Sequence, residues 1–198
     1  VYGGSNFGQS MNQTDIQDFL QGLQSPVNGD ALDAVVACCS FIQLTRGAKL
    51  IETGRRHPFL YLIVQGSVKS YYLSEGKEVC TWFAFEGEVV STMGTFAGHP
   101  SNETVELLED AALIRIHVKD FKALSINRAS VARLITEWVI EHAIFLENLL
   151  YLQSLPVKMR YEHILEARPE ILQRVSLTDL ASFLGMSRES LSRIRSAR

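Results

Sequence analysis

The spacing of hydrophobic residues changes twice along the chain. Over residues 14–39 apolar side chains recur every three or four positions, which predicts helix with a break at the Pro and Gly residues of 26–29. Over residues 41–118 the pattern becomes short runs of β-branched and aromatic residues separated by glycines, which predicts strands. Many short strands at this spacing are typical of a barrel or roll.

A helical spacing returns at Asp120 and continues into a long apolar stripe. The stripe predicts one helix over residues 128–155, which Pro156 ends, and a shorter helix follows over residues 157–167. A helix this long in a small domain packs its stripe against the roll or against a twin helix. We predict a dimer seam on this helix, formed by Leu134, Trp138, Phe145 and Leu149.

The closing segment, LTDLASFLGMSRESLSRIRS over residues 177–196, has the spacing of a helix-turn-helix. Ser176 is the expected N-cap of its first helix, and the small Ala181 allows the second helix to approach closely. Gly185 supplies a turn residue that tolerates a positive φ, and Leu191 is the expected buried anchor of the second helix. The combination of these features favours DNA binding over an ordinary solvated terminal helix.

The second of these helices separates its apolar and polar residues onto opposite faces. Leu191, Ile194 and Ala197 share one face, while arginines, serines and one glutamate share the other. Such a polar face suits the major groove, where arginine bonds guanine and glutamate accepts from cytosine. We predict base contacts from Arg188, Glu189 and Arg193, and phosphate contacts from Ser187, Ser192, Arg195 and Thr178.

The charge distribution adds a reason to expect a local contact with a polyanion. The chain has a net charge of −3, but its two parts differ in sign. Residues 1–155 carry 11 Lys and Arg against 17 Asp and Glu, whereas residues 156–198 carry 8 against 5. The basic segment, which ends at Arg198, thus contains the predicted helix-turn-helix.

From residue 14 onward the chain resembles the Crp/Fnr family of transcription regulators. SRESLSR (187–193) is similar to the family's recognition helix, FLYLIVQGSVKSYY to its β-roll hairpin, and FEGEVV to the opening of its phosphate-binding cassette. The resemblance implies a homodimer whose paired recognition helices read an inverted repeat on double-stranded DNA. It also implies a half-site with a T-G-A-like core, read by Glu189 and Arg193, and RNA polymerase as a partner.

The sequence departs from the family where members that bind a cyclic nucleotide hold its phosphate. Those members use a cassette glutamate for the ribose, matched here by Gly87 and Glu88, and an arginine for the phosphate. No arginine lies between Arg56 and Arg115, and the corresponding stretch, HPSNETVE, carries glutamates instead. A buried phosphodiester needs a cation or a nest of amides, so we predict that the chain does not bind cAMP or cGMP with physiological affinity. The effector stays unidentified, and the candidates for its pocket are Gly87, Glu88, His99, Ser101 and Glu103.

The prediction as a whole is an α+β chain. Residues 1–10 are expected to be a tag or a disordered tail, and residues 11–127 a double-stranded β-roll sensor domain similar to cyclic-nucleotide-binding domains. Residues 128–155 are the expected dimerisation helix, and residues 156–198 the DNA-binding domain. The resemblance implies a helix-turn-helix of the winged-helix type, although the sequence ends at Arg198, before the wing that often follows the recognition helix.

Other functions find little support in the sequence. It contains no nucleophile elbow, P-loop or Rossmann fingerprint, so we predict no catalytic residue and no enzyme. The five histidines lack metal-site spacing, which predicts neither a metal nor a cofactor. Without a membrane-spanning run or a secretion signal, a cytoplasmic location is expected. Two alternatives stay open: a β-roll module that acts through a protein partner, and a cupin-like enzyme.

Overall fold

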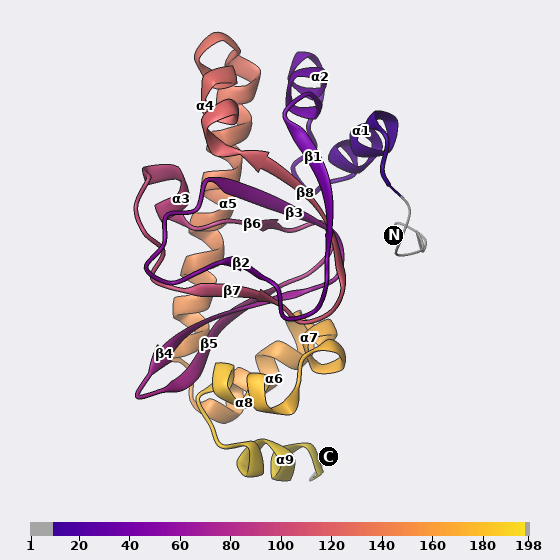
Figure 1. Ribbon diagram of the computed structural model, residues 1–198. Coiled ribbons are helices and arrows are strands. Elements are labelled where there is room, and N and C mark those ends of the chain that lie inside the picture. The colour runs from indigo at the N-terminus through magenta and orange to yellow at the C-terminus, as the bar shows by residue number, and fades with distance from the viewer. Residues whose placement is uncertain (1–9, 197–198) are drawn as a thin grey trace.

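The structure of the protein is a computed structural model that describes residues 10–196. Residues 1–9 and 197–198 lie outside the described part, so most of the predicted tail and the predicted place of Ala197 on the apolar helix face fall there. The described chain forms a β-roll, a long helix beside it, and helices at both ends of the roll (Figure 1).

Two short helices precede the roll, α1 (Gln13–Gln21) and α2 (Asp30–Val36). Their apolar faces belong to one buried core together with strand residues of the roll, which explains the helical spacing of this segment. The pattern predicted helix as far as residue 39, but α2 ends at Val36. The difference arises because Cys39 pairs with Ile116 in the sheet and therefore takes an extended backbone.

The roll consists of two four-stranded antiparallel sheets with the strand orders β1-β8-β3-β6 and β2-β7-β4-β5. Apolar residues from both sheets, among them Ile63, Leu113 and Val105, meet in a core between them. The predicted roll is therefore confirmed. The strands are β1 (Cys39–Leu44), β2 (Lys49–Ile51), β3 (Phe59–Gln65), β4 (Val68–Ser74), β5 (Lys77–Ala84), β6 (Val89–Val90), β7 (Thr104–Leu107) and β8 (Ala111–His117).

The turn from β3 to β4 requires glycine. Gly66 has a φ of +109°, and a Cβ placed on it would lie 2.7 Å from the Cβ of Ala111 on β8. The close approach lets the chain leave one sheet and enter the other without displacing β8. The turn thus fixes where β4, the strand that carries Lys69, begins relative to β3.

Three helices follow the cassette segment. The short helix α3 (Met93–Ala97), which the sequence did not indicate, is capped by the side chain of Thr92. After β8 the chain enters α4 (Val118–Asn127) and then α5 (Ala129–Ser154), a helix of 26 residues. The bounds of α5 lie one residue inside the predicted range of 128–155 at each end.

The chain ends in four helices, called here the C-terminal unit. They are α6 (Val157–Ala167), α7 (Pro169–Arg174), α8 (Leu177–Leu184) and α9 (Arg188–Ser196). Leu180, Leu184 and Leu191 form the centre of their core, and all three are fully buried.

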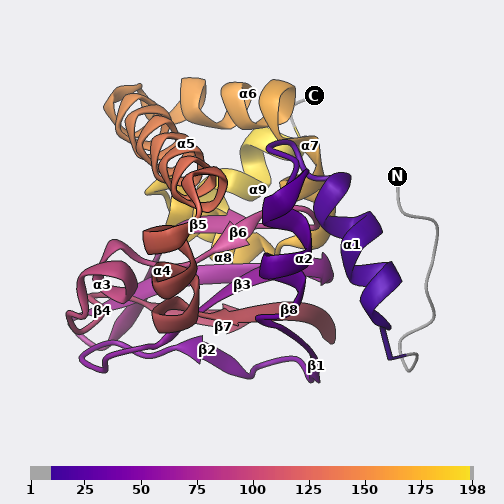
Figure 2. The same cartoon turned by 90° about the horizontal axis from the view of Figure 1, so that it is seen from above.

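Figure 1 shows how these parts are arranged. Helices α1, α2 and α4 lie toward one end of the roll, and the C-terminal unit lies at the other. Helix α5 runs alongside the roll from the first end to the second, and the view from above in Figure 2 shows it covering one side of the strands. The order of roll, long helix and C-terminal helices agrees with the predicted fold class.

Candidate functional site

The first helix of the C-terminal motif is held by a cap at each end. The hydroxyl of Ser176 accepts a hydrogen bond of 3.0 Å from the backbone N–H of Asp179. Gly185 ends α8 in the left-handed conformation, with a φ of +71°. Ala181 is 2% exposed and lies against the buried Leu191 core, so the small side chain allows the two helices to approach. The predicted helix-turn-helix is therefore present.

The second helix, α9, presents its polar face to solvent. Its N-cap is Ser187, whose hydroxyl accepts from the backbone N–H of Ser190 at 3.1 Å. Leu191 is fully buried and Ile194 is half-buried, so the apolar stripe faces α8 as the helical wheel predicted. All of the residues predicted to contact DNA are exposed: Thr178, Ser187, Arg188, Glu189, Ser192, Arg193 and Arg195.

The charges on α9 are available to a ligand. None of its three described arginines forms an ion pair with another described residue. The pKa of Glu189 lies below its ordinary value, because its own backbone N–H and the Ser187 hydroxyl hydrogen-bond to the carboxylate, and because Arg188 and Arg193 lie nearby. Glu189 is therefore ionised at neutral pH and acts only as a hydrogen-bond acceptor.

A buried lysine of the roll fixes α8 to strands β4 and β5. Lys69 is 8% exposed, and its Nζ donates to Glu78 at 2.6 Å and to Asp179 of α8 at 3.1 Å. Burial alone would lower the pKa of Lys69, but the two carboxylates outweigh it and hold the pKa above its ordinary value. The lysine is thus a permanent cation between the roll and the helix-turn-helix.

Strand β5 is bonded to α8 through Ser182 as well. The Ser182 hydroxyl accepts from the backbone N–H of Cys80 and donates to the carbonyl of Glu78, both at 3.0 Å. The rings of Phe83 and Phe183 meet edge to face, with their centroids 5.3 Å apart. Hydrogen bonds and apolar contact therefore hold the same two elements together.

A second contact surrounds Phe85, beyond the end of β5. The guanidinium groups of Arg168 and Arg174 lie 5.4 and 5.1 Å from the centre of its ring. Arg174 also binds Glu86, at 2.6 Å, and Glu109, while Arg168 lies 3.1 Å from Glu88. The sequence did not indicate these docking residues, because each arginine is about eighty or more positions from its cassette carboxylate.

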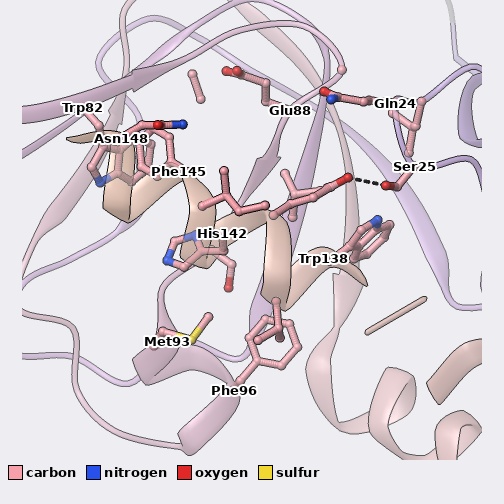
Figure 3. Close-up of a pocket in the computed structure, with 18 of the residues that line it drawn as sticks. Gln24, Ser25, Trp82, Glu88, Met93, Phe96, Trp138, His142, Phe145 and Asn148 are labelled. Carbon is pink, nitrogen blue, oxygen red and sulfur yellow. Dashed lines mark hydrogen bonds between the residues drawn. The ribbon is translucent and has the colours of Figure 1, made fainter. Parts of the chain in front are cut away.

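A cavity of about 350 Å³ lies between the roll and α5 (Figure 3). Its walls come from the turn between β5 and β6, from α3, from the middle of α5 and from the loop after α1. The lining is mainly apolar and aromatic: Leu23, Trp82, Phe83, Ala84, Val89, Met93, Phe96, Trp138, Val139, Ile144 and Phe145. The remaining lining residues are Gln24, Ser25, Gly87, Glu88, Ser91, Glu141, His142 and Asn148.

The predicted effector-pocket residues do not all meet at this cavity. Gly87 and Glu88 line it, but one oxygen of Glu88 accepts from the backbone N–H of Phe85 and the carboxylate also pairs with Arg168. His99 is exposed in the loop after α3, and Ser101 is buried with its hydroxyl bonded to the backbone of Glu103. Contact with an effector thus stays a prediction for all five residues: Gly87, Glu88, His99, Ser101 and Glu103.

Glu103 is half-buried, and one of its carboxylate oxygens accepts three hydrogen bonds. Its Oε2 accepts from Ser70 at 2.5 Å, from the indole N–H of Trp82 at 3.0 Å and from Thr81 at 3.3 Å. The pKa of His142 is lowered by burial, and the charge of Glu103 partly opposes that effect. A carboxylate therefore stands behind Trp82, in the segment where cyclic-nucleotide-binding members carry the arginine that holds the phosphate.

The four residues predicted for a dimer seam lie against the chain itself. Leu134 and Trp138 are 4% and 7% exposed and belong to the core that includes α4 and the roll. Phe145 and Leu149 are half-buried against the core between the sheets. Other apolar residues of α5 are exposed instead: Val139, Ile140, Ile144, Leu146, Leu150 and Tyr151.

Within residues 10–196 no helix has both the length and the apolar character needed to cross a bilayer. In the same range, no three His, Cys, Asp or Glu side chains are grouped so that they could hold a metal ion. The pKa of the buried Cys80 thiol is raised to about 12, chiefly by burial, so this cysteine is protonated at neutral pH.

Comparison with known proteins identifies the roll. Residues 41–128 match the family model of the cyclic nucleotide-binding domain. A comparison with curated protein sequences gave no match. The family match covers strands β2 to β8 and α4, and it includes the segment FEGEVV that the sequence analysis compared with the phosphate-binding cassette.

Several solved structures share the whole arrangement. FixK2 from Bradyrhizobium japonicum is 19% identical with a TM-score of 0.69, and the match covers 80% of this chain and 83% of that one. The c-di-GMP responsive global regulator CLP from Xanthomonas campestris is 21% identical with a TM-score of 0.66, covering 83% and 88%. A CooA mutant from Carboxydothermus hydrogenoformans is 13% identical with a TM-score of 0.66, covering 96% and 84%. These three are Crp/Fnr regulators, so the predicted resemblance is confirmed at the level of fold.

Proposed function

We propose that this chain, which contains a cyclic nucleotide-binding domain and has the fold of the Crp/Fnr regulators, is a DNA-binding transcription regulator. The observation that carries the proposal is the exposed polar face of α9, whose arginines have no ion-pair partner among the described residues. A buried anchor and a cap stabilise any terminal helix. The exposed face that carries arginines, serines and one glutamate is the feature that matches a helix of the major groove.

In this proposal α9 enters the major groove with its N-terminal end toward the bases. Arg188 and Arg193 donate to guanine O6 and N7, and the ionised Glu189 accepts from cytosine N4. The phosphate oxygens are bound by four exposed residues around this centre: Ser187, Ser192, Arg195 and Thr178. Glu189 and Arg193 would then read the T-G-A-like core that the family resemblance implies.

The proposed regulator is a homodimer that reads an inverted repeat. Helix α5 exposes apolar residues at positions 139, 140, 144, 146, 150 and 151, which fall at helical spacing along one side. We place the centre of the seam at Ile140 and Ile144, which are 52% and 51% exposed, and not at the buried Leu134 and Trp138. Twofold pairing of α5 would present two α9 helices to one face of the duplex.

We further propose that the chain does not bind cAMP. Glu103 keeps a carboxylate at the end of the cassette segment, fixed by hydrogen bonds from Ser70 and Trp82, and the cavity lining contains neither lysine nor arginine. A phosphodiester placed there would lose its hydration without gaining a cation. Calorimetry with cAMP is expected to give no heat of binding, and a Kd in the micromolar range would contradict this proposal.

DNA binding itself is tested by fluorescence anisotropy with a random-sequence duplex at several salt concentrations. The wild-type chain should bind and lose affinity steeply as salt rises, since its arginines release counterions from the phosphates. A variant with Arg188, Arg193 and Arg195 changed to alanine should bind far more weakly and with a shallower salt slope. Absence of binding by the wild type at low salt would favour the alternative, a β-roll module that acts through a protein partner.

The proposed role is regulatory and not catalytic, and RNA polymerase enters it as a further partner only through the family resemblance. The cupin-like alternative would need a group of metal ligands. Such a group does not occur in the part of the chain that the structure describes, and metal analysis of the purified protein tests that alternative directly.

A further inference from the structure

The cavity between the roll and α5 has the wrong charge for the anion that its domain type suggests. Among the described residues that line it there is no lysine or arginine, and there are two carboxylates, Glu88 and Glu141. Arg168 neutralises Glu88 from outside the lining, at 3.1 Å. Glu141 has no cation within ion-pair distance among the described residues, although the Ser25 hydroxyl donates to one of its oxygens (Figure 3).

The surroundings of Glu141 are aromatic. Trp138 lies one turn before it on α5 and Phe145 one turn after it, so both rings share its side of the helix. Phe145 meets Trp82 of β5 edge to face with their centroids 6.3 Å apart, and this pair continues the wall into the roll. The electron-rich faces of such rings attract a cation, most strongly when water is excluded.

We propose that this cavity binds an apolar organic cation, such as an aryl-alkyl amine, with the ammonium group beside Glu141 and the apolar body against the wall that Trp82 and Phe145 form. The carboxylate and the hydroxyl of Ser25 orient the charged end, and the aromatic walls exclude water from the rest. The volume of about 350 Å³ is at the small end of ordinary ligand pockets and suits a molecule of this class.

The location of the cavity gives the bound molecule a path to the C-terminal unit. Glu88 lines the cavity and holds Arg168, which stacks on Phe85 next to Arg174. A cation in the cavity attracts the carboxylate of Glu88 and repels the guanidinium of Arg168. The ion pair between Glu88 and Arg168, which helps to dock the C-terminal unit, is thereby weakened. Only this regulatory meaning rests on the proposed function, because the binding of an organic cation does not require that the chain bind DNA.

The test compares three probes that share one apolar body and differ in charge. They are 4-phenylbutylamine, 4-phenyl-1-butanol and 4-phenylbutanoate, titrated into the full chain by calorimetry near neutral pH in the absence of DNA. The amine should bind at least about tenfold more tightly than the carboxylate, with the alcohol between them. Equal or tighter binding of the carboxylate, or binding of none of the three at millimolar concentration, would overturn the proposal.

Substitutions place the binding at Glu141. Glu141→Gln keeps an acceptor for Ser25 and removes the charge. The affinity for the amine should therefore fall about tenfold, while the affinity for the alcohol should not change. Glu137→Gln is the matched control, because Glu137 lies one turn earlier on α5, is exposed and does not line the cavity. If both variants bind the amine as the wild type does, Glu141 is not its partner and the proposal fails.

A second variant covers the case in which Glu141→Gln does not fold. Asn148 is exposed at the rim of the cavity, so Asn148→Lys adds a cation there without disturbing the core. This variant should bind the amine more weakly and the carboxylate more tightly than the wild type does. The ratio of the two affinities should therefore fall by about tenfold or more. An unchanged preference would show that the cavity is not where the probes bind.

Discussion

Arg193 distinguishes base recognition from phosphate contact at the scale of single residues. It is exposed on α9, and its only described hydrogen bond is a 3.5 Å contact to the Ser190 hydroxyl. We expect Arg193→Ala to weaken binding to the preferred operator by about 1–3 kcal/mol and to relax discrimination at one base pair, because a bidentate contact to guanine is lost. Anisotropy titrations against operators mutated at each half-site position measure both effects.

The control for this prediction is Arg133→Ala, which removes the same charge from an exposed position on α5. It should leave both affinity and discrimination unchanged, because Arg133 lies on the long helix and pairs only with Glu137. If Arg193→Ala weakens every sequence equally, Arg193 touches only phosphate, and the assignment of base reading to it is wrong.

Glu86 links stability to pH. Burial alone would raise the pKa of Glu86, but hydrogen bonds from Arg174, from its own backbone N–H and from that of Gly66 outweigh burial and hold the pKa below its ordinary value. A carboxylate with a lowered folded pKa stabilises the fold above its unfolded pKa, and this stabilisation is lost as pH falls through the folded pKa. Glu86→Gln should therefore lower the free energy of unfolding near pH 7 by about 1 kcal/mol or less, since both side chains are partly exposed.

Urea unfolding followed by tryptophan fluorescence checks this pH dependence. The difference in the free energy of unfolding between wild type and Glu86→Gln should shrink as the pH is lowered from 7 to about 3. Glu52→Gln is a suitable control, because Glu52 pairs only with the highly exposed Arg55. A difference that stays constant or grows toward acid pH would contradict the ion pair.

The sequence predicted single residues well only where their partners are local. Spacing within about twenty positions predicted three features: the cap of Ser176, the turn at Gly185 and the exposed face of α9. The structure contains all three. Lys69, Arg168 and Arg174 were not predicted as docking residues. Their partners are brought near by the packing of α8 and the roll, which periodicity does not encode.

At the scale of elements, the long helix α5 has two apolar sides with different partners. The buried Leu134 and Trp138 pack on α4 and the roll, while Ile140, Ile144 and Leu150 are exposed. A periodic stripe predicts that a helix packs against something, but it does not say which residues face the chain and which face a partner. All four residues of the predicted seam therefore lie on the inner side, and the exposed side carries a different set of apolar residues.

We expect Ile140→Glu together with Ile144→Glu to convert the proposed dimer into a monomer, because two charges would be buried at the centre of the seam. Sedimentation velocity measures the change in mass. Leu73→Glu together with Ile126→Glu is the matched control, because it adds the same two charges at exposed apolar residues of β4 and α4, outside the proposed seam. A variant that remains a dimer would place the interface elsewhere, and a wild type that sediments as a monomer would refute the dimer altogether.

Other elements show why local pattern is an incomplete guide. The roll and α5 were predicted because their periods persist over long stretches, whereas α3 has five residues and α7 has six. Helices this short are determined by caps and tertiary contacts more than by periodicity. The end of the helical pattern at Val36 and not at residue 39 has the same origin, because pairing with β8 overrides the local preference of Cys39.

At the scale of the whole molecule, the C-terminal unit is docked on its own roll. Helix α8 is held on β5 by Lys69, by Ser182 and by the Phe83–Phe183 pair. Helix α7 is held near Phe85 by Arg168 and Arg174. The position of α9 is therefore set by the roll and α5 together. A change at the cavity wall can reach the start of α7 through Glu88 and Arg168, and this contact is the physical basis for a sensor role of the roll.

The central claim is that this molecule reads a specific inverted repeat as a dimer. The most direct measurement is selection of bound sequences from a random duplex pool by the full chain, at a salt concentration that suppresses nonspecific binding. The account predicts enrichment of an inverted repeat whose half-sites have centres about ten base pairs apart and contain a T-G-A-like core. Retention of DNA without any enriched sequence, or no retention at all, would contradict it.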